Sequence, residues 1–456
     1  MRDVLVTLLF MYGMVWALRR PYVAALLWVW VGLMNPHRLG WGFAYDLPFG
    51  LISAAVLILS MAMHSREVSW PRGMAPIRLL VVLMLWMGVT SVTALHVDLS
   101  LLKYVDVLKV LGVTLLVASV VIDRRQIIGL IWMATLSIAF FGIKGGIFTI
   151  STGGAFRVWG PPSSLVNGNN ELALALVITI PLLYFLARNL HLSADLPFIG
   201  KISPGWLKRG LYLSMVLCAI AAVGSQSRGA FLAIGAMSVF LWWRSRSKLS
   251  LGFMLLMLVP AVLMFMPEEW MERMHTIHNF EEDRSAMGRI HAWTMAVNIA
   301  NDRFFGGGFA TATKYVYALY APPEAHDTLV AHSVYFQILG EHGYVGLMIY
   351  LWFWWATYRT ANRLGRYAKA TKELAWVGEL GAMCKVSMIG FAVGGAFLSL
   401  AYWDMPFYLM VVLVATEHYV KAHLSAGATA AETAAARAAV APERSTGPVG
   451  QPRAAG

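Results

Sequence analysis

The chain has 456 residues, of which 59% are hydrophobic and only 13% are charged. A soluble domain carries roughly twice that share of charge, so the composition excludes an ordinary soluble protein. The formal net charge of +12 does not indicate a nucleic-acid partner, because the basic residues lie between apolar runs, where they set membrane topology.

Apolar runs long enough, or nearly long enough, to cross a bilayer recur along the whole chain. They predict membrane helices near residues 4–18, 21–35, 48–63, 76–95, 101–121, 126–150, 170–187, 208–223, 226–243, 249–266, 333–358, 378–401 and 405–421. No small-residue cleavage site follows the first run, so it is not predicted to be a removable signal peptide. Because that run is short, we expect about twelve full spans in an all-α, polytopic transmembrane bundle.

Basic residues gather in alternate loops, as at Arg19-Arg20, Arg124-Arg125 and Lys208-Arg209. The positive-inside rule places these loops in the cytoplasm. The loops expected to face outward are then 36–47, 96–100, 151–169, 224–225, 267–332 and 402–404. The longest of them contains two helix patterns, PEEWMERMHTIHNF and GRIHAWTMAVNIANDRF, and ordered loops of such length usually carry function.

These features predict four parts. Residues 1–266 form an N-terminal transmembrane bundle, and residues 267–332 form an outward-facing helical loop. Residues 333–423 form the C-terminal transmembrane helices. Residues 424–456, rich in Ala, Pro and Gly, form a disordered cytoplasmic tail.

A titratable side chain, His332, opens the span that follows the long loop. Ionisable groups at membrane depth are costly and mark functional sites by default. Three arginines share the outward side with it by topology: Arg157, Arg228 and Arg289. Arg228 stands at the outer end of a span, where the positive-inside rule disfavours a positive charge. Either its side chain snorkels to the interface or bonds backbone carbonyls, or it belongs to an anion site. With Ser333 and these arginines nearby, His332 is a candidate catalytic residue.

Other polar residues are more ambiguous. Glu341 and His342 lie deeper and beside glycines, which favours a packing role. The asparagines of VNGNNE (Asn167, Asn169 and Asn170) either bond sugar hydroxyls or cap the following span.

A metal site is disfavoured. His275 and His278 are spaced to share a helix face, and His291 follows, but no cysteine or carboxylate cluster accompanies them. No outward Asp-x-Asp pair is present, so a bound diphosphate would have to be neutralised by arginines. The triple glycine at 306–308 lacks the context of a phosphate loop and is predicted to be a turn or a point of close approach.

Three motifs, GSQSRGAFLAI, GRIHAWTMAVNIANDRFFGGGF and HSVYFQILGEHGYVGL, occur in order around the long loop. With them, residues 1–420 resemble the O-antigen ligase superfamily, which includes Wzy-type polymerases. Two further stretches, WVGLMNPHRLGWGFAYDLPF and GIKGGIFTISTGGAFRVWGPP, are similar to the O-glycosylation ligases that accompany exosortase systems.

The resemblance implies a membrane glycosyltransferase of the GT-C type in the bacterial inner membrane, with its site facing the periplasm. Such enzymes take a glycan from undecaprenyl diphosphate and join it to an acceptor hydroxyl, which in ligases belongs to a lipid A core sugar. The family's catalytic histidine and two arginines correspond to His332, Arg228 and Arg289. Arg157, Asn167, Asn170 and Ser333 are expected at the substrate, and no cofactor or metal is expected.

Three kinds of function remain open from the sequence: a ligase, a polymerase and a transporter. The ligase and the polymerase share the same chemistry and differ in their acceptor, as does a protein O-glycosylation ligase. A transporter of lipid-linked sugar would need polar residues through the full depth of the bundle and often two related halves, which the sequence does not show.

Overall fold

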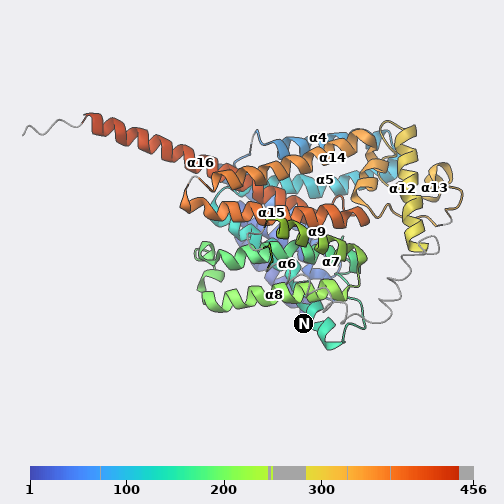
Figure 1. The fold of residues 1–456 in the computed structure, drawn as a ribbon, viewed down its shortest axis with the longest axis horizontal. Coiled ribbons are helices and arrows are strands. Elements are labelled where there is room, and N and C mark those ends of the chain that lie inside the picture. The colour runs from blue at the N-terminus through green and yellow to red at the C-terminus, as the bar shows by residue number, and fades with distance from the viewer. Residues whose placement is uncertain (72, 245–247, 250–283, 326, 370, 441–456) are drawn as a thin grey trace, which may run out of the picture.

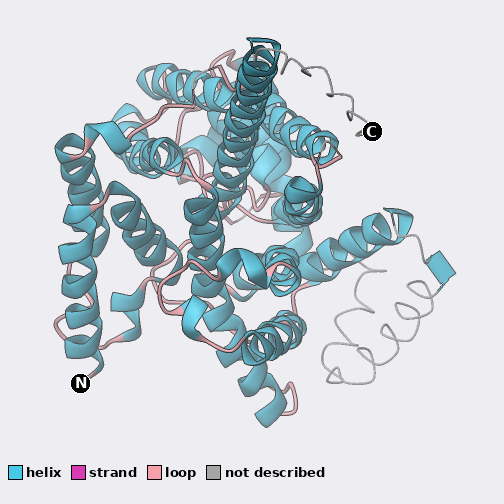
Figure 2. Cartoon of the chain, turned by 90° about the vertical axis from the view of Figure 1, so that its left-hand side faces the viewer, coloured by secondary structure: helices cyan, strands magenta, loops and turns pink. Residues whose placement is uncertain are grey.

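A computed structural model describes every residue except 72, 245–247, 250–283, 326, 370 and 441–456. Over the described residues the chain consists of helices, turns and loops and contains no strand, as Figure 2 shows. The expected all-α class is therefore confirmed.

The helices of the first half follow the apolar runs. They are α1 (Arg2–Arg19), α2 (Pro21–Met34), α3 (Phe49–Met63), α4 (Ala75–Val92), α5 (Val97–Val120), α6 (Arg124–Ser151), α7 (Asn169–Arg188), α8 (Pro204–Gly224) and α9 (Arg228–Arg244).

Local chemistry sets several helix boundaries. Pro21 opens α2, where its fixed φ suits the first helical position. A reciprocal capping box between Asp123 and Gln126 opens α6.

The second half contains α12 (Arg284–Asp302), α13 (Lys314–Tyr320), α14 (Val334–Tyr367), α15 (Ala375–Gly394) and α16 (Asp404–Val440). The pattern GRIHAWTMAVNIANDRF forms α12, as predicted. The pattern PEEWMERMHTIHNF and all but the first residue of the expected span at 249–266 lie outside the described residues. The helix α16 continues to Val440, which differs from the disordered tail expected from residue 424; this stretch is rich in Ala, the strongest helix former.

Among the described residues, five stretches are long and apolar enough to cross a membrane: α4, α6, α7, α8 and Lys372–Phe397, which contains α15. The helices α2 and α3 and the part of α9 from Arg228 to Trp243 are apolar but shorter. The total of about twelve spans stays a prediction.

Loops expected on the outward side meet at one end of the bundle. Asn169 Nδ2 donates to the Ser225 carbonyl at 2.8 Å, and His96 Nε2 and Thr313 Oγ1 form a hydrogen bond at 3.1 Å. Figure 1 shows α12 lying across this end, roughly perpendicular to α14 and α15, with α13 beside it.

Loops expected in the cytoplasm meet at the opposite end. Arg124 pairs with Asp195 at 3.4 Å, and Arg188 pairs with Glu379 at 3.5 Å. The extension of α16 also leaves the bundle there (Figure 1). The alternation of loops read from charge thus agrees with the packing.

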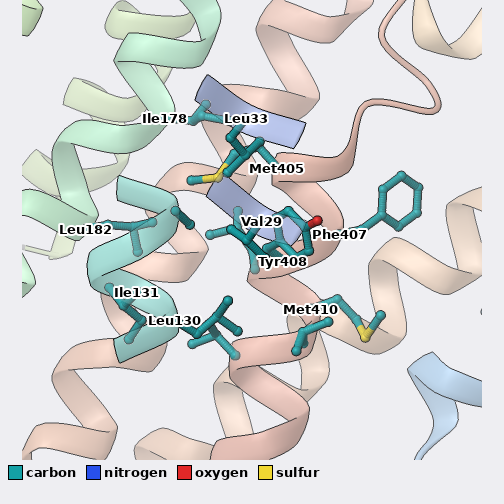
Figure 3. Close-up of a cluster of buried hydrophobic side chains, with 14 of the residues drawn as sticks. Val29, Leu33, Leu130, Ile131, Ile178, Leu182, Met405, Phe407, Tyr408 and Met410 are labelled. Atoms are coloured by element: carbon teal, nitrogen blue, oxygen red, sulfur yellow. The ribbon is translucent and has the colours of Figure 1, made fainter. Parts of the chain in front are cut away.

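The core lies where α16 passes between other helices. All residues from 401 to 417 are buried, as expected for a helix surrounded by protein. Figure 3 shows side chains from α2, α6, α7 and α16 gathered there: Val29, Leu33, Leu130, Ile131, Ile178, Leu182, Met405, Phe407, Tyr408 and Met410.

The helix α14 is broken at Gly343, whose φ of 67° and ψ of −175° are non-helical. A break leaves backbone carbonyls without their intrahelical donors, and buried carbonyls need replacements. The loop before α13 supplies them: the N–H groups of Gly307 and Gly308 donate to the carbonyls of Gly340 and Glu341, each at 2.8 Å. A Cβ on Gly306 would lie 2.5 Å from Gly343 N. The triple glycine is therefore a point of close approach, as predicted.

Candidate active site

His332 lies two residues before α14, at the end of the bundle covered by α12. Its backbone is left-handed, with φ of 43°. Both polar groups of the peptide bond that precedes it are held: Trp293 Nε1 donates to the Ala331 carbonyl at 2.7 Å, and His332 N–H donates to Ser399 Oγ at 2.9 Å. The backbone that carries the half-buried imidazole is thereby fixed between α12 and the segment that follows α15.

Arg289 approaches His332 from α12. It precedes Trp293 by four residues, so the two side chains share a helix face. Trp293 stacks on Phe336 of α14 with ring centroids 4.9 Å apart, which seats this face on the start of α14. Burial and, to a smaller extent, the Arg289 guanidinium lower the pKa of His332 below its ordinary value. A neutral imidazole with a free lone pair is the form that can accept a proton.

Glu171 is a residue that the sequence reasoning missed. It is half-buried in the first turn of α7, and the charge of Arg289 acts on its carboxylate as well as on His332. An acidic residue in a first helical turn usually complements the helix dipole, so its position in the sequence gave no functional signal.

Arg228 is the first residue of α9 and is half-buried. A Cβ on the adjacent Gly229 would lie 3.6 Å from Phe397 Cβ in η7 (Gly395–Phe397). The same short helix contacts Val334 through Gly395, next to His332. Arg228 therefore begins its helix in the neighbourhood of the histidine, as the family correspondence requires.

Arg157 is tied to the turn between α8 and α9. Its Nε donates to Gln226 Oε1 at 3.3 Å, and Gln226 Nε2 donates to the Gly154 carbonyl at 3.3 Å. Gln226 itself has a φ of 57°. The arginine predicted from charge alone thus lies beside the turn that ends at Arg228.

The asparagines divide into different roles. Asn169 bonds the Ser225 carbonyl and so joins α7 to the end of α8. The capping position of α7 is Gly168, and no side chain caps this helix, so Asn167 and Asn170 do not serve as caps. Asn167 is exposed and Asn170 is half-buried at the same end of the bundle. They remain candidates for sugar contacts.

Ser333 is 1% exposed, and its hydroxyl has no hydrogen-bond partner among the described atoms. It also makes no side-chain cap for α14, although it occupies the capping position. Leaving a buried hydroxyl unpaired is costly. The role at the substrate that the sequence predicts for Ser333 stays a prediction.

Glu341 and His342 form a separate buried network. Tyr402 donates its hydroxyl to Glu341 and bonds His342 Nε2 at 2.8 Å, while His342 Nδ1 bonds Thr90 Oγ1 at 2.7 Å. Trp86 donates to the His342 carbonyl at 2.9 Å. These bonds join α4, α14 and the start of α16, which supports the packing role predicted for the pair.

The metal site that the sequence disfavours has no assembled ligands in the described part of the chain. No three His, Cys, Asp or Glu side chains gather there. His275 and His278 lie outside it, and His291 is half-buried on α12.

The bundle, its apolar helices and the polar residues at one end define an integral membrane protein. Residues 213–351 match the family described as O-antigen ligase, a stretch that runs from α8 into α14 and contains Arg228, Arg289 and His332. The chain therefore carries an O-antigen ligase domain. Residues 1–191 match a family of unknown function, DUF5935. No curated protein matches the chain.

Proposed function

We propose that the chain is an inverting, GT-C-type glycosyltransferase of about twelve spans that transfers a glycan from undecaprenyl diphosphate to an acceptor hydroxyl. The acceptor is a lipid A core sugar, and transfer takes place at the periplasmic face of the bacterial inner membrane. The observation that supports this most is that α12, which carries Arg289, is joined through Trp293 to the peptide before His332 within the O-antigen ligase domain.

The chemistry follows from a donor that is already activated. The acceptor oxygen forms a bond to the anomeric carbon while the bond from that carbon to the diphosphate oxygen breaks. The diphosphate leaves with the bonding electron pair, and the hydroxyl proton passes to the neutral imidazole of His332. A single displacement inverts the anomeric centre and needs no protein nucleophile.

The arginines supply the electrostatic part of the reaction. Negative charge grows on the leaving oxygen, and preorganised guanidinium groups stabilise it more in the transition state than in the bound donor. Arg228, Arg289 and Arg157 carry planar guanidinium forks that suit phosphate oxygens. With this much positive charge at the site, the reaction is proposed to proceed without a divalent metal.

The function is tested with purified protein in detergent, undecaprenyl-diphosphate-linked glycan and lipid A core, with and without excess chelator. We expect equal transfer in both conditions and a product of inverted anomeric configuration. Activity that collapses with chelator and returns with magnesium or manganese contradicts the arginine mechanism. Elongation of the donor glycan with no transfer to lipid A core identifies a polymerase instead.

A further inference from the structure

The helix α5 exposes charged side chains at a depth where lipid surrounds the protein. Lys103, Asp106 and Lys109 are all exposed, and they follow one another at a spacing of three residues within the expected span 101–121. Residues three apart are neighbours on a helix surface, so these three form a continuous stripe, which we term the α5 stripe. Charged groups in membrane helices almost always face the interior of the bundle, and these do not.

The depth of the α5 stripe follows from a contact between α5 and α4. The hydroxyl of Tyr104 donates to the Met84 carbonyl at 3.2 Å, and Met84 lies in the middle of α4. Because α4 is long and apolar enough to cross a membrane, its middle belongs in the hydrocarbon layer. The stripe begins beside Tyr104 and continues away from the outer end of the bundle. Its charges therefore lie below the level of the outer headgroups.

Contacts on another face of α5 fix the direction in which the stripe points. Ser100 Oγ accepts a hydrogen bond from the Phe309 N–H at 2.9 Å, and Val107 and Leu111 are buried in the core. A rotation that brought the charges inward would break these contacts and expose the apolar side chains. The stripe is thus a built feature of the outer surface of the bundle.

We propose that the α5 stripe is the surface on which a second copy of this chain docks in the membrane. Its charges run positive, negative, positive, so the stripe is complementary to itself. Two copies in one membrane share their orientation and are related by a two-fold axis along the membrane normal. Residues three apart on a helix differ in height by about 4.5 Å, so Asp106 of each copy can pair with a lysine of the other. The exposed Leu102 and Val105 lie beside the charges and supply apolar contacts around these pairs.

Lipid is the competing occupant of this surface. Asp106 and Lys109 form an ion pair at 3.1 Å within α5, and Lys103 can extend its charge toward the outer interface. However, the two paired side chains remain 65% and 59% exposed, and hydrocarbon offers them no further hydrogen-bonding partner. An anionic headgroup would attract the lysines but repel Asp106. A surface that carries both signs is matched best by another surface that carries both signs.

The test exchanges the charges between two forms of the full-length protein. Asp106→Lys makes the stripe wholly positive, and Lys103→Glu combined with Lys109→Glu makes it wholly negative. Self-association is measured in lipid vesicles as energy transfer between chains labelled at the C-terminus, over a range of lipid-to-protein ratios. We expect each altered form alone to associate about tenfold more weakly than wild type, or weaker still, because like charges then face each other. An equal mixture of the two forms should regain wild-type association.

The matched control is Lys144→Glu, which reverses the charge of an exposed lysine on the apolar helix α6 and should leave self-association unchanged. Recovery in the mixture is the decisive result, because contacts with lipid cannot produce it. Wild-type protein that stays monomeric at every ratio overturns the inference. Association that survives in both altered forms overturns it too, as does association that both forms lose and their mixture does not regain.

If an altered form does not fold, as judged by thermal unfolding, single cysteines in the otherwise unchanged stripe replace the charge exchange. Leu102→Cys or Val105→Cys should link two copies under oxidation, since a disulfide needs Cα atoms within about 7 Å of each other. Leu213→Cys, at an exposed position of α8, should not link them. The native Cys218 and Cys384 are buried. No cross-linking at either stripe position, or equal cross-linking at all three positions, overturns the inference.

Discussion

At the scale of single residues, the site depends on how the backbone of His332 is fixed. A φ of 43° is uncommon for a residue with a side chain, although histidine tolerates it better than most. Such a conformation persists where the surroundings determine it, and here Trp293 and Ser399 hold both polar groups of one peptide bond. The backbone position from which the imidazole extends is thereby fixed, which helps to position a general base.

The charge of Arg289 should be visible in the pH dependence of the reaction. Arg289→Gln removes a positive charge that helps to keep the pKa of His332 low, so the pKa of His332 should rise. Because the base must be neutral, the acidic limb of kcat/KM should move to higher pH. Lys314→Gln, which removes an exposed positive charge from the same side, should leave the limb in place. A shift to lower pH, or no shift, would argue against this pairing.

The contribution of Arg228 to activity should depend on the shape of its side chain and not only on its charge. Arg228→Lys keeps the positive charge but loses the planar fork that can bridge two phosphate oxygens. We expect kcat/KM for the lipid-linked donor to fall by about tenfold or more, the equivalent of one lost charged hydrogen bond. The control Arg78→Lys changes an exposed arginine at the other end of the bundle. Full activity of Arg228→Lys would make Arg228 a packing or topology residue.

At the scale of elements, the break in α14 shapes the outer end of the bundle. It separates the first turns of the helix, which follow His332, from the longer part that begins after Gly343. The conformation at Gly343 is one that essentially only glycine adopts. The N–H groups of Gly307 and Gly308 then donate to the Gly340 and Glu341 carbonyls, which the break leaves without helical donors.

Substitution of Gly343 should therefore be costly. A Cβ there would lie 2.5 Å from the Phe304 carbonyl oxygen, in addition to the backbone strain. We expect Gly343→Ala to destabilise the protein by about 2 kcal/mol or more and to lower the apparent Tm in detergent. Gly365→Ala, in a regular part of the same helix with nothing within 4 Å of the new Cβ, should leave the Tm unchanged or raise it. Equal Tm values for the two variants would contradict the role assigned to the break.

The elements were largely predictable because apolar runs and flanking charges report directly on helices in a membrane. The break in α14 was not, since Gly340 and Gly343 show only that the backbone is free to bend. The continuation of α16 was missed because its alanines were taken as a sign of disorder.

At the scale of the whole molecule, the site is assembled from segments far apart in the chain. Trp293 and His332 come from α12 and the segment before α14, and Ser399 bonds the backbone of His332 from behind α15. A single sequence carries no signal for which helices pack together. The motif resemblance predicted Arg228, Arg289 and His332 as a set, but the contacts between their elements come from packing.

The two ends of the bundle give a direct test of topology. A single cysteine at Trp41, which is 91% exposed in the expected outward loop 36–47, should react with a small membrane-impermeant maleimide in intact cells. A cysteine at the exposed Lys201, in a loop at the other end, should react only after the inner membrane is opened. The native Cys218 and Cys384 are buried and should give little background. The reverse pattern of labelling would place the site in the cytoplasm.

The central claim is that His332 takes the proton from the acceptor hydroxyl. The most direct measurement compares His332→Ala with wild type for two properties of the same purified protein: binding of undecaprenyl diphosphate and glycan transfer to lipid A core. His191→Ala, at an exposed histidine of the opposite end, serves as the control. We predict that His332→Ala binds the lipid diphosphate nearly as well as wild type and loses transfer by about 100-fold or more, the usual contribution of a general base. Near-normal transfer by His332→Ala would contradict the account.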